Sequence, residues 1–239
     1  MLPSEQSPSI KRLLVEHLSQ FLLERRFEAL KSALNNRTRY LTVVLEDIFQ
    51  SQNASAVLRT CECFGIQDVH IIENQNRFNL NPRVVLGSSK WLTINRYKAP
   101  EFSTIDAIQH LKNEGYRIVA TSPHINDSTL SQFELGKGKA ALVFGTELTG
   151  LSQTVMDNAD EFMYIPMLGL TESLNISVSA AVCIHYLTNK LRLFGQDFSL
   201  SESEKDELMY QWLKLSVKSA NALEKRFLKS LNENERLKK

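Results

Sequence analysis

Short β-type runs alternate with helical stretches between residues 41 and 193, and this alternation constrains the fold most. The expected strands are rich in β-branched and other apolar side chains. They are Leu41–Leu45, Val69–Ile72, Val84–Leu86, Leu92–Tyr97, Arg117–Thr121, Ala140–Phe144 and Phe162–Ile165. The expected helices are Ala54–Phe64, Thr104–Glu114, Ser152–Asn158 and Ile176–Leu193. Such an order predicts an α/β domain with a largely parallel sheet.

Helical patterns flank this region on both sides. Apolar residues recur at helical spacing over residues 7–32 and predict one helix there. Ser201, with Glu204 three residues later, forms a capping-box pattern at the start of a long amphipathic helix. We therefore expect an N-terminal helical extension at residues 1–40, a central domain at 41–193 and a C-terminal helical extension at 194–239.

Charge is distributed unevenly along the chain, although the net charge is only +1. Residues 1–40 carry a net charge of +3 and residues 214–239 one of +5, whereas residues 41–213 carry −7. Basic ends on an acidic body suggest arms that bind a polyanion. The alternative is that these lysine-rich helices are solvated faces, and charge alone does not decide between the two.

Several common chemistries are missing from the sequence. Residues 46–53, after the first expected strand, contain no glycine, which disfavours a Rossmann phosphate loop. The pair Gly145 and Gly150 has P-loop spacing, but Leu151 stands where the lysine is required. The three cysteines form no CxxC pair and the five histidines have no metal-ligand spacing, so we expect no metal.

Neither a membrane span nor a secretory signal is predicted. No apolar run approaches the ~18 residues that a membrane helix needs. Residues 1–11 contain no apolar stretch typical of a signal peptide. The expected location is the cytoplasm, which also suits a chain with an odd number of cysteines.

Three segments carry functional signals, and the first runs from Asn53 to Cys61. Asn53 follows a strand closely and is a good helix N-cap, and Arg59 lies six residues further along that helix. Taken alone, the segment fits a simple cap followed by a surface arginine better than it fits a site.

The second segment begins where the apolar run Ala140–Phe144 ends on Gly145. A glycine at the carboxyl end of a strand lets a ligand approach the backbone, where open α/β sheets bind ligands. The carboxylate of Glu147 could accept hydrogen bonds from sugar hydroxyls or a guanine edge. The plain alternative is a tight β–α turn with Glu147 near a helix entry.

The third segment extends from Ile165 into the helix expected from Ile176. Ser173 or Asn175 is placed to cap this helix, and its first turns are rich in small residues that allow close packing. Backbone N–H groups at its start would form a polar cradle. An ordinary capped helix is again the alternative.

In this order and spacing, the three segments resemble the SPOUT superfamily of methyltransferases. More narrowly they resemble its SpoU branch of RNA ribose 2′-O-methyltransferases, over about residues 41–190. The basic ends and the pair Lys90-Trp91 are similar to the tRNA guanosine methyltransferase subgroup, TrmH. The resemblance implies a parallel α/β sheet with a C-terminal deep trefoil knot. Topology rules disfavour knots, so that expectation comes from the resemblance alone.

The resemblance also implies a cofactor and an assembly. The family binds S-adenosyl-L-methionine in a bent conformation, mostly through backbone groups. The matching positions are Thr121, Gly145, Ile165 and Leu174. Members act as homodimers in which the second subunit contributes to the substrate site, and they require no metal.

The implied reaction is methyl transfer to a ribose 2′-hydroxyl of RNA. Arg59 matches the arginine that is proposed to take the hydroxyl proton with help from an RNA phosphate, or only to orient both groups. Asn53 would position Arg59, and Glu147, Ser173 and Asn175 would shape the ribose and cofactor pocket.

The expected substrate is the guanosine at position 18 of the tRNA D-loop. A ribosomal RNA or anticodon-loop 2′-O-methyltransferase is an alternative, and the small anticodon-loop members lack long terminal extensions. A catalytically silent RNA-binding protein with the same fold is a second alternative. It is disfavoured because a binding module has no need of all five predicted catalytic residues.

Overall fold

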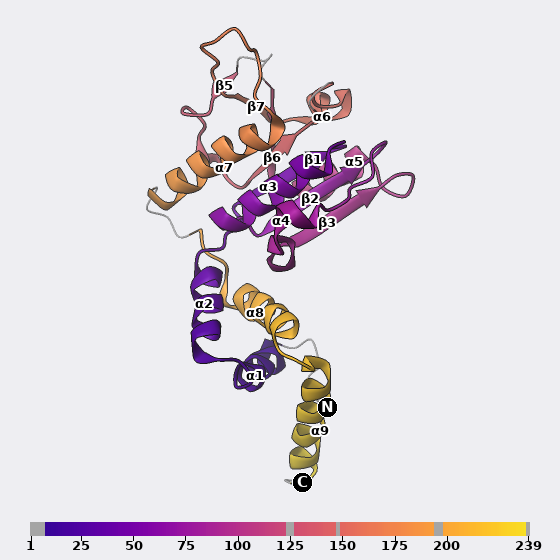
Figure 1. The fold of residues 1–239 in the computed structure, drawn as a ribbon, viewed down its shortest axis with the longest axis vertical. Coiled ribbons are helices and arrows are strands. Elements are labelled where there is room, and N and C mark those ends of the chain that lie inside the picture. The colour runs from indigo at the N-terminus through magenta and orange to yellow at the C-terminus, as the bar shows by residue number, and fades with distance from the viewer. Residues whose placement is uncertain (1–7, 123–126, 147–148, 194–197, 238–239) are drawn as a thin grey trace. The chain divides into compact units, whose positions relative to one another are not determined.

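The computed structural model describes residues 8–122, 127–146, 149–193 and 198–237. Its contacts divide the chain into two compact units. The helical unit comprises residues 1–37 and 199–239, and the sheet unit comprises residues 38–198. Figure 1 shows the elements of each unit along the chain. The expected division at 40/41 and 193/194 stays a prediction.

The sheet unit contains a seven-stranded sheet in the order β3-β2-β1-β6-β4-β7-β5, and all its strand pairs are parallel. The strands are β1 (Leu41–Glu46), β2 (Asp68–Glu73), β3 (Thr93–Lys98), β4 (Arg117–Thr121), β5 (Ser128–Thr129), β6 (Ala140–Phe144) and β7 (Glu161–Tyr164). The prediction of a parallel α/β sheet is confirmed. Strand β6 lies between β1 and β4, and β7 between β4 and β5. The trefoil knot stays a prediction.

Helices cover both faces of this sheet (Figure 1). They are α3 (Ser51–Phe64), α4 (Pro82–Val85), α5 (Thr104–Asn113), α6 (Gln153–Asn158) and α7 (Ile176–Leu193), with short 3₁₀ turns η1 (Ser88–Trp91) and η2 (Leu135–Lys137). Alternate residues of β1 face opposite sides. Val43 and Leu45 join the core shared with α3 and α7, and Val44 joins the core shared with α5 and α6.

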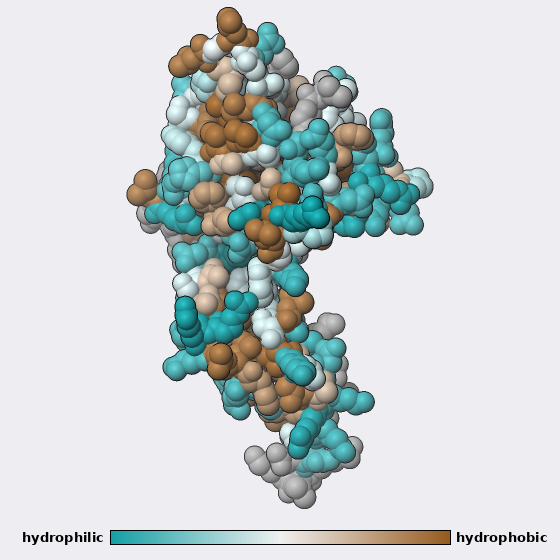
Figure 2. All heavy atoms as spheres, in the orientation of Figure 1, coloured by the Kyte–Doolittle hydropathy of each residue, from teal (hydrophilic) through white to brown (hydrophobic). Residues whose placement is uncertain are grey.

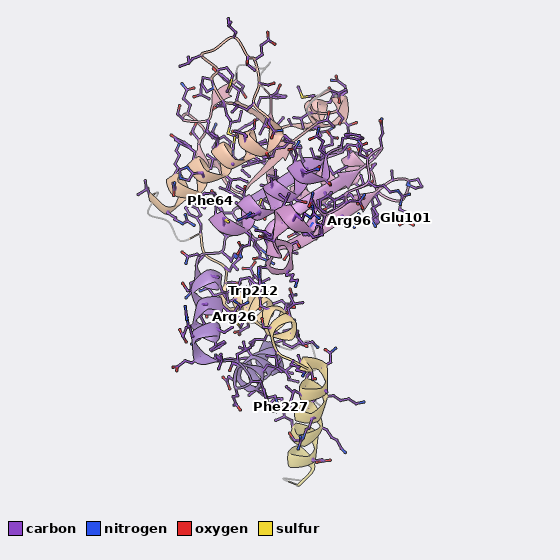
Figure 3. All side chains as sticks on the ribbon, viewed as in Figure 1. Arg26, Phe64, Arg96, Glu101, Trp212 and Phe227 are labelled. Carbon is purple, nitrogen blue, oxygen red and sulfur yellow. The ribbon has the colours of Figure 1, made fainter. Side chains whose placement is uncertain are left out.

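The helical unit contains α1 (Pro8–Ser19), α2 (Glu24–Asn35), α8 (Glu202–Ser216) and α9 (Ala220–Leu237). Trp212 of α8 is buried, with the guanidinium of Arg37 5.3 Å from its ring centroid. Phe227 of α9 stacks on His17 of α1 at 4.2 Å. Figure 3 labels both aromatic residues. The predicted capping box of Ser201 and Glu204 is confirmed.

Two predicted single helices are each broken in the structure. The helix expected over 7–32 ends at Ser19, and α2 starts at Glu24, so that both helices can pack against α8. The long C-terminal helix is interrupted where Ser219 has a left-handed φ of 58°. This break lets α9 turn back onto α1. Helical periodicity does not reveal such interruptions, because the apolar spacing continues through them.

The strand predicted at Val84–Leu86 is wrong, because this stretch is helical. Asn81 caps α4 by accepting a hydrogen bond from the Arg83 N–H at 3.0 Å, and Pro82 occupies the first turn. These two start signals outweigh the β-propensity of a short valine run. Strand β5 was not predicted, since it has only two residues.

Among the described residues, no helix combines the length and the apolar character that crossing a bilayer requires.

Candidate active site

A pocket of about 240 Å³ opens at the carboxyl ends of three adjacent strands, β6, β4 and β7. This is the edge where open α/β sheets place ligands. Its lining comes from the ends of those strands, the turn after β6, the loop 165–175 and the first turns of α7. The lining residues are Thr121, Ser122, Phe144, Gly145, Thr146, Thr149, Gly150, Leu151, Met163, Tyr164, Ile165, Met167, Glu172, Ser173, Leu174, Ile176, Ser179 and Cys183.

All four predicted cofactor positions line this pocket, although they come from separate segments. Thr121 ends β4, and its hydroxyl donates to the Val143 carbonyl at 2.7 Å, which ties β4 to β6. Ile165 follows β7, and Leu174 precedes α7 with 38% of its surface exposed. The structure therefore brings these positions together, and their role in binding a cofactor stays a prediction.

Gly145 is required by the turn that forms one wall of the pocket. A Cβ atom at this position would lie 2.2 Å from the Gly150 carbonyl oxygen. Thr146 and Gly150 exchange two backbone hydrogen bonds of 3.0 Å, which close the turn directly over Gly145. The sequence argument assigned this glycine to ligand approach, and the structure adds a packing reason.

Glu147 lies outside the described residues. The predicted role of its carboxylate stays a prediction.

Asn53 and Asn175 meet although 122 residues separate them. The Asn175 amide donates to Asn53 Oδ1 at 3.3 Å, and this contact joins α3 to the start of α7. Asn175 caps α7, because its Oδ1 accepts from the Ser177 N–H at 2.9 Å. Ser173 lies in the preceding loop and lines the pocket.

The prediction that Asn53 is an N-cap is wrong. Helix α3 begins at Ser51, with Gln50 as its N-cap, so Asn53 lies within the first turn. Its side chain is buried and bonds to Gln50 Oε1 at 3.2 Å as well as to Asn175. The Asn53 side chain therefore bonds to Gln50 and Asn175 and does not cap the helix, contrary to the prediction from its local pattern.

Arg59 is exposed on α3 and is not part of the pocket lining. It makes no hydrogen bond or ion pair with any residue that the structure describes, so its guanidinium is available to a ligand. Arg59 follows Asn53 by six residues, which corresponds to a rotation of about 240° around the helix axis. Asn53 and Arg59 therefore lie on different faces of α3. The positioning of Arg59 by Asn53 stays a prediction, because no contact between these two described residues supports it.

Glu46 is a site residue that the sequence argument missed. Its buried carboxylate accepts hydrogen bonds from the Ser152 hydroxyl at 2.6 Å, the Ser152 N–H at 2.9 Å and the Thr104 hydroxyl at 2.9 Å. It thereby fixes the end of the turn that starts at Gly145. An acidic residue that ends a strand of otherwise apolar character is the signal that could have found it.

Cys183 is a second residue that sequence did not single out. It lines the pocket from α7, and burial raises the pKa of its thiol to about 12. The thiol is therefore protonated at neutral pH and is not an activated nucleophile. Within the described ranges, no three His, Cys, Asp or Glu side chains are arranged to hold a metal ion.

An all-parallel sheet with a ligand pocket at its carboxyl edge defines the class of protein: an α/β enzyme that binds a small ligand beside its strand ends. The profile of the SpoU rRNA methylase family matches residues 40–185. The chain belongs to this family and is a methyltransferase. The family predicted from the three segments is thus confirmed.

Named relatives agree with this assignment. A tRNA (guanosine(18)-2′-O)-methyltransferase of Borreliella burgdorferi is 46% identical, over 87% of this chain and 93% of the relative. The enzyme of the same name from Escherichia coli is 29% identical, over 78% and 81% of the two chains. The crystal structure of the TrmH/SpoU tRNA modifying enzyme of A. aeolicus has a TM-score of 0.72 and 27% identity, covering 82% of this chain and 98% of that one.

Proposed function

We propose that this protein transfers a methyl group from S-adenosyl-L-methionine to the ribose 2′-hydroxyl of guanosine 18 in the D-loop of tRNA. One observation supports the reaction most: positions from three distant segments, each predicted to bind the cofactor, line a single pocket at the carboxyl edge of the sheet. The names of the Borreliella burgdorferi and Escherichia coli relatives support the substrate.

The chemistry of the pocket fits S-adenosyl-L-methionine. Apolar side chains such as Phe144 and Leu174 suit a purine ring, and the hydroxyls of Thr121 and Ser173 suit polar groups of the ligand. Among the described lining residues, Glu172 alone is charged, and its carboxylate favours a cationic ligand. The bound cofactor would supply an electrophilic methyl group on a sulfonium.

Methyl transfer also requires a group that manages the proton of the 2′-hydroxyl. That hydroxyl is a weak acid, so removal of its proton and alignment with the methyl group both limit the rate. A free arginine stays protonated at neutral pH. Arg59 therefore acts with an RNA phosphate that helps it take the proton, or it only holds phosphate and hydroxyl in position.

We propose that the active protein is a homodimer. Val178, Val182 and Tyr186 recur at four-residue spacing on α7 and are 46%, 38% and 39% exposed in the single chain. Such an apolar stripe is typical of a helix that packs against a partner. Arg59 does not line the pocket of its own chain, as expected where a second subunit completes the site. Sedimentation should give a dimer at micromolar concentration.

The cytoplasm is the proposed location, because the proposed tRNA substrate is found there. The three free cysteines suit a reducing compartment.

Two alternatives give different outcomes in the same experiment. A ribosomal RNA or anticodon-loop enzyme would modify another nucleotide, and a silent RNA-binding protein would modify none. The match to the Borreliella burgdorferi enzyme extends over 87% of this chain, well beyond the 40–185 region of the family profile. This extent favours the tRNA substrate.

The test uses the full-length protein, unmodified tRNA transcript, a matched ribosomal RNA fragment and labelled S-adenosyl-L-methionine. The labelled nucleoside is then mapped. Guanosine 18 is the expected site, and a label elsewhere or no label would refute the proposal. Arg59→Ala should lower kcat about 10²-fold or more and leave the cofactor Kd unchanged. Cys63→Ser, an exposed change one turn further along α3, is the matched control.

A further inference from the structure

Residues 74–100 form the longest stretch of the sheet unit without any acidic residue. Residues 74–100 carry five basic side chains and no Asp or Glu, within a 41–213 region whose net charge is −7. The cations are Arg77, Arg83, Lys90, Arg96 and Lys98. The net charge of −7 therefore does not describe the whole surface of this region, because positive charge is concentrated in residues 74–100.

Arg77, Arg83 and Lys90 are exposed and form no ion pair within the described parts of the chain. Lys98 is exposed as well, but its charge acts on Glu73 and lowers the pKa of that carboxyl. Several other cations of the sheet unit are paired, as Arg39 is with Asp68, Lys112 with Asp160 and Arg117 with Glu161. We define the basic surface as Arg77, Arg83 and Lys90. Figure 2 shows strongly hydrophilic side chains over α4, which carries Arg83.

Carboxylates near the basic surface are already occupied. Glu73 accepts hydrogen bonds from Arg96 at 2.7 and 2.8 Å and from the Phe78 N–H at 2.9 Å. Figure 3 labels Arg96 on β3. Asp47 Oδ1 accepts hydrogen bonds from three successive N–H groups, those of residues 74–76, at 2.8 to 3.0 Å. These contacts hold the loop that carries Arg77, and they leave the cations of the basic surface unneutralised.

The basic surface adjoins the helix that carries Arg59. The Asn81 N–H donates to the Ser55 hydroxyl of α3 at 2.8 Å, and both α4 and η1 pack against α3. Ser55 and Arg59 are four residues apart, so they share one face of α3. Arg59, the residue predicted to act on the ribose, therefore continues the series of unpaired cations along α3.

An exposed aromatic ring lies close to the same loop. Phe49 is 75% exposed and follows Asp47 by two residues, and Asp47 is bonded to residues 74–76. An exposed phenyl ring beside unpaired cations is the combination that binds unpaired nucleotides, with bases stacked on the ring and phosphates on the cations.

We propose that Arg77, Arg83 and Lys90 bind the phosphodiester backbone of the RNA loop that contains the target nucleotide, and that Phe49 stacks on one of its unpaired bases. The proposal rests on the proposed function, because it specifies how that substrate meets the chain. The phosphates of the RNA strand would follow the basic surface toward Arg59, and the ribose to be methylated would lie beside Arg59.

The test measures binding of an unmodified tRNA transcript to full-length protein at several salt concentrations. Replacing Arg77, Arg83 and Lys90 together by Gln should weaken binding roughly 10- to 100-fold and reduce the salt slope by about 2. The matched control replaces Lys112, Lys137 and Lys139 by Gln. It removes the same charge near the amino ends of β4 and β6 and should leave the slope unchanged.

Phe49→Ala separates stacking from charge, because it should weaken binding roughly tenfold without changing the salt slope. Thermal melting and the cofactor Kd identify variants that fail to fold. The double variant Arg77→Lys, Arg83→Lys should retain binding, since phosphate contact needs only the charge.

An unchanged slope in a folded triple Gln variant would overturn the inference, even where the wild type methylates guanosine 18. Absence of methylation by the wild type would instead refute the proposed function and leave the slope measurement valid.

Discussion

The two halves of the sheet unit hold their loops by different means. In the anchored half, residues 41–98, carboxylates fix the loops at the strand ends: Asp47 binds three backbone N–H groups and Glu73 binds Arg96. In the pocket half, residues 117–193, two backbone bonds between Thr146 and Gly150 close the turn over Gly145, and Glu46 of the anchored half holds the end of that turn. Unpaired cations project from the anchored half, whereas the pocket lies beside the turn of the pocket half.

This difference explains why the glycine-rich turn is missing after the first strand. In this fold the pocket is at the ends of β4, β6 and β7, so the critical glycine follows β6. The end of β1 instead has Glu46 and Asp47, both of which accept several hydrogen bonds. A search for the Rossmann pattern therefore examines the wrong half of the sheet.

Gly145→Ala should have the largest effect, because it breaks the pocket half at its closest backbone contact. The new methyl group would lie 2.2 Å from a carbonyl oxygen, so the turn must move. We expect the cofactor affinity to fall about 10²-fold and stability to fall by about 2–3 kcal/mol. Calorimetry and urea denaturation measure the two effects.

Gly169→Ala is the matched control for this prediction. Gly169 lies in the loop 165–175 of the same half, and a Cβ there would meet no atom within 4 Å. Its cofactor affinity and stability should match the wild type. Equal behaviour of the two variants would show that the Gly145 turn does not shape the pocket.

Acidification should destabilise the protein through a group in the anchored half. Burial, and then the charge of His110, lowers the pKa of His70 from 6.5 to about 4. Between these two values the unfolded chain binds more protons than the folded one, so stability falls as the pH decreases from 6.5 to 4. The loss is about 3 kcal/mol.

Urea denaturation at pH 7 and pH 5 should show about 2 kcal/mol of this loss, because pH 5 lies inside the window between the two pKa values. His70→Gln should remove that part of the pH dependence, at some cost in stability at pH 7, because the Tyr97 hydroxyl lies 3.0 Å from His70 Nδ1. His185→Gln, at an exposed position on α7, is the control. A variant at position 70 with the wild-type pH dependence would exclude His70 as the source.

Long, strongly patterned elements were predictable from the sequence. The bounds of β4, β6 and α7 agree with the predicted ranges, because their apolar residues follow the core on one or both faces. The run at 84–86 was misassigned because three residues carry too little periodicity to outweigh the start signals at Asn81 and Pro82.

The candidate site was predictable only where one segment carries its own signal. The cofactor positions each end a recognisable strand or precede a helix, and parallel strands bring their carboxyl ends to one edge. The bond of Asn53 to Asn175 and the bonds of Glu46 to Ser152 join residues more than 100 positions apart. The pairing of such residues leaves no local pattern, although the acidic end of β1 at Glu46 is itself visible in the sequence.

Asp47→Ala tests the anchored half most directly and has the smallest expected effect. The change removes the acceptor for three N–H groups of residues 74–76, and these can turn to water because the loop is largely exposed. Stability should fall by only about 1 kcal/mol. The loop that carries Arg77 would lose its fixed position, so tRNA affinity should fall severalfold while the cofactor Kd stays unchanged.

Asp106→Ala is the charge-matched control, because its carboxylate caps α5 by accepting hydrogen bonds from Ser103. It should cost similar stability without loss of tRNA affinity. Equal tRNA affinities for the two variants would mean that the carboxylate clamp supports the fold alone, and that the basic surface does not depend on it.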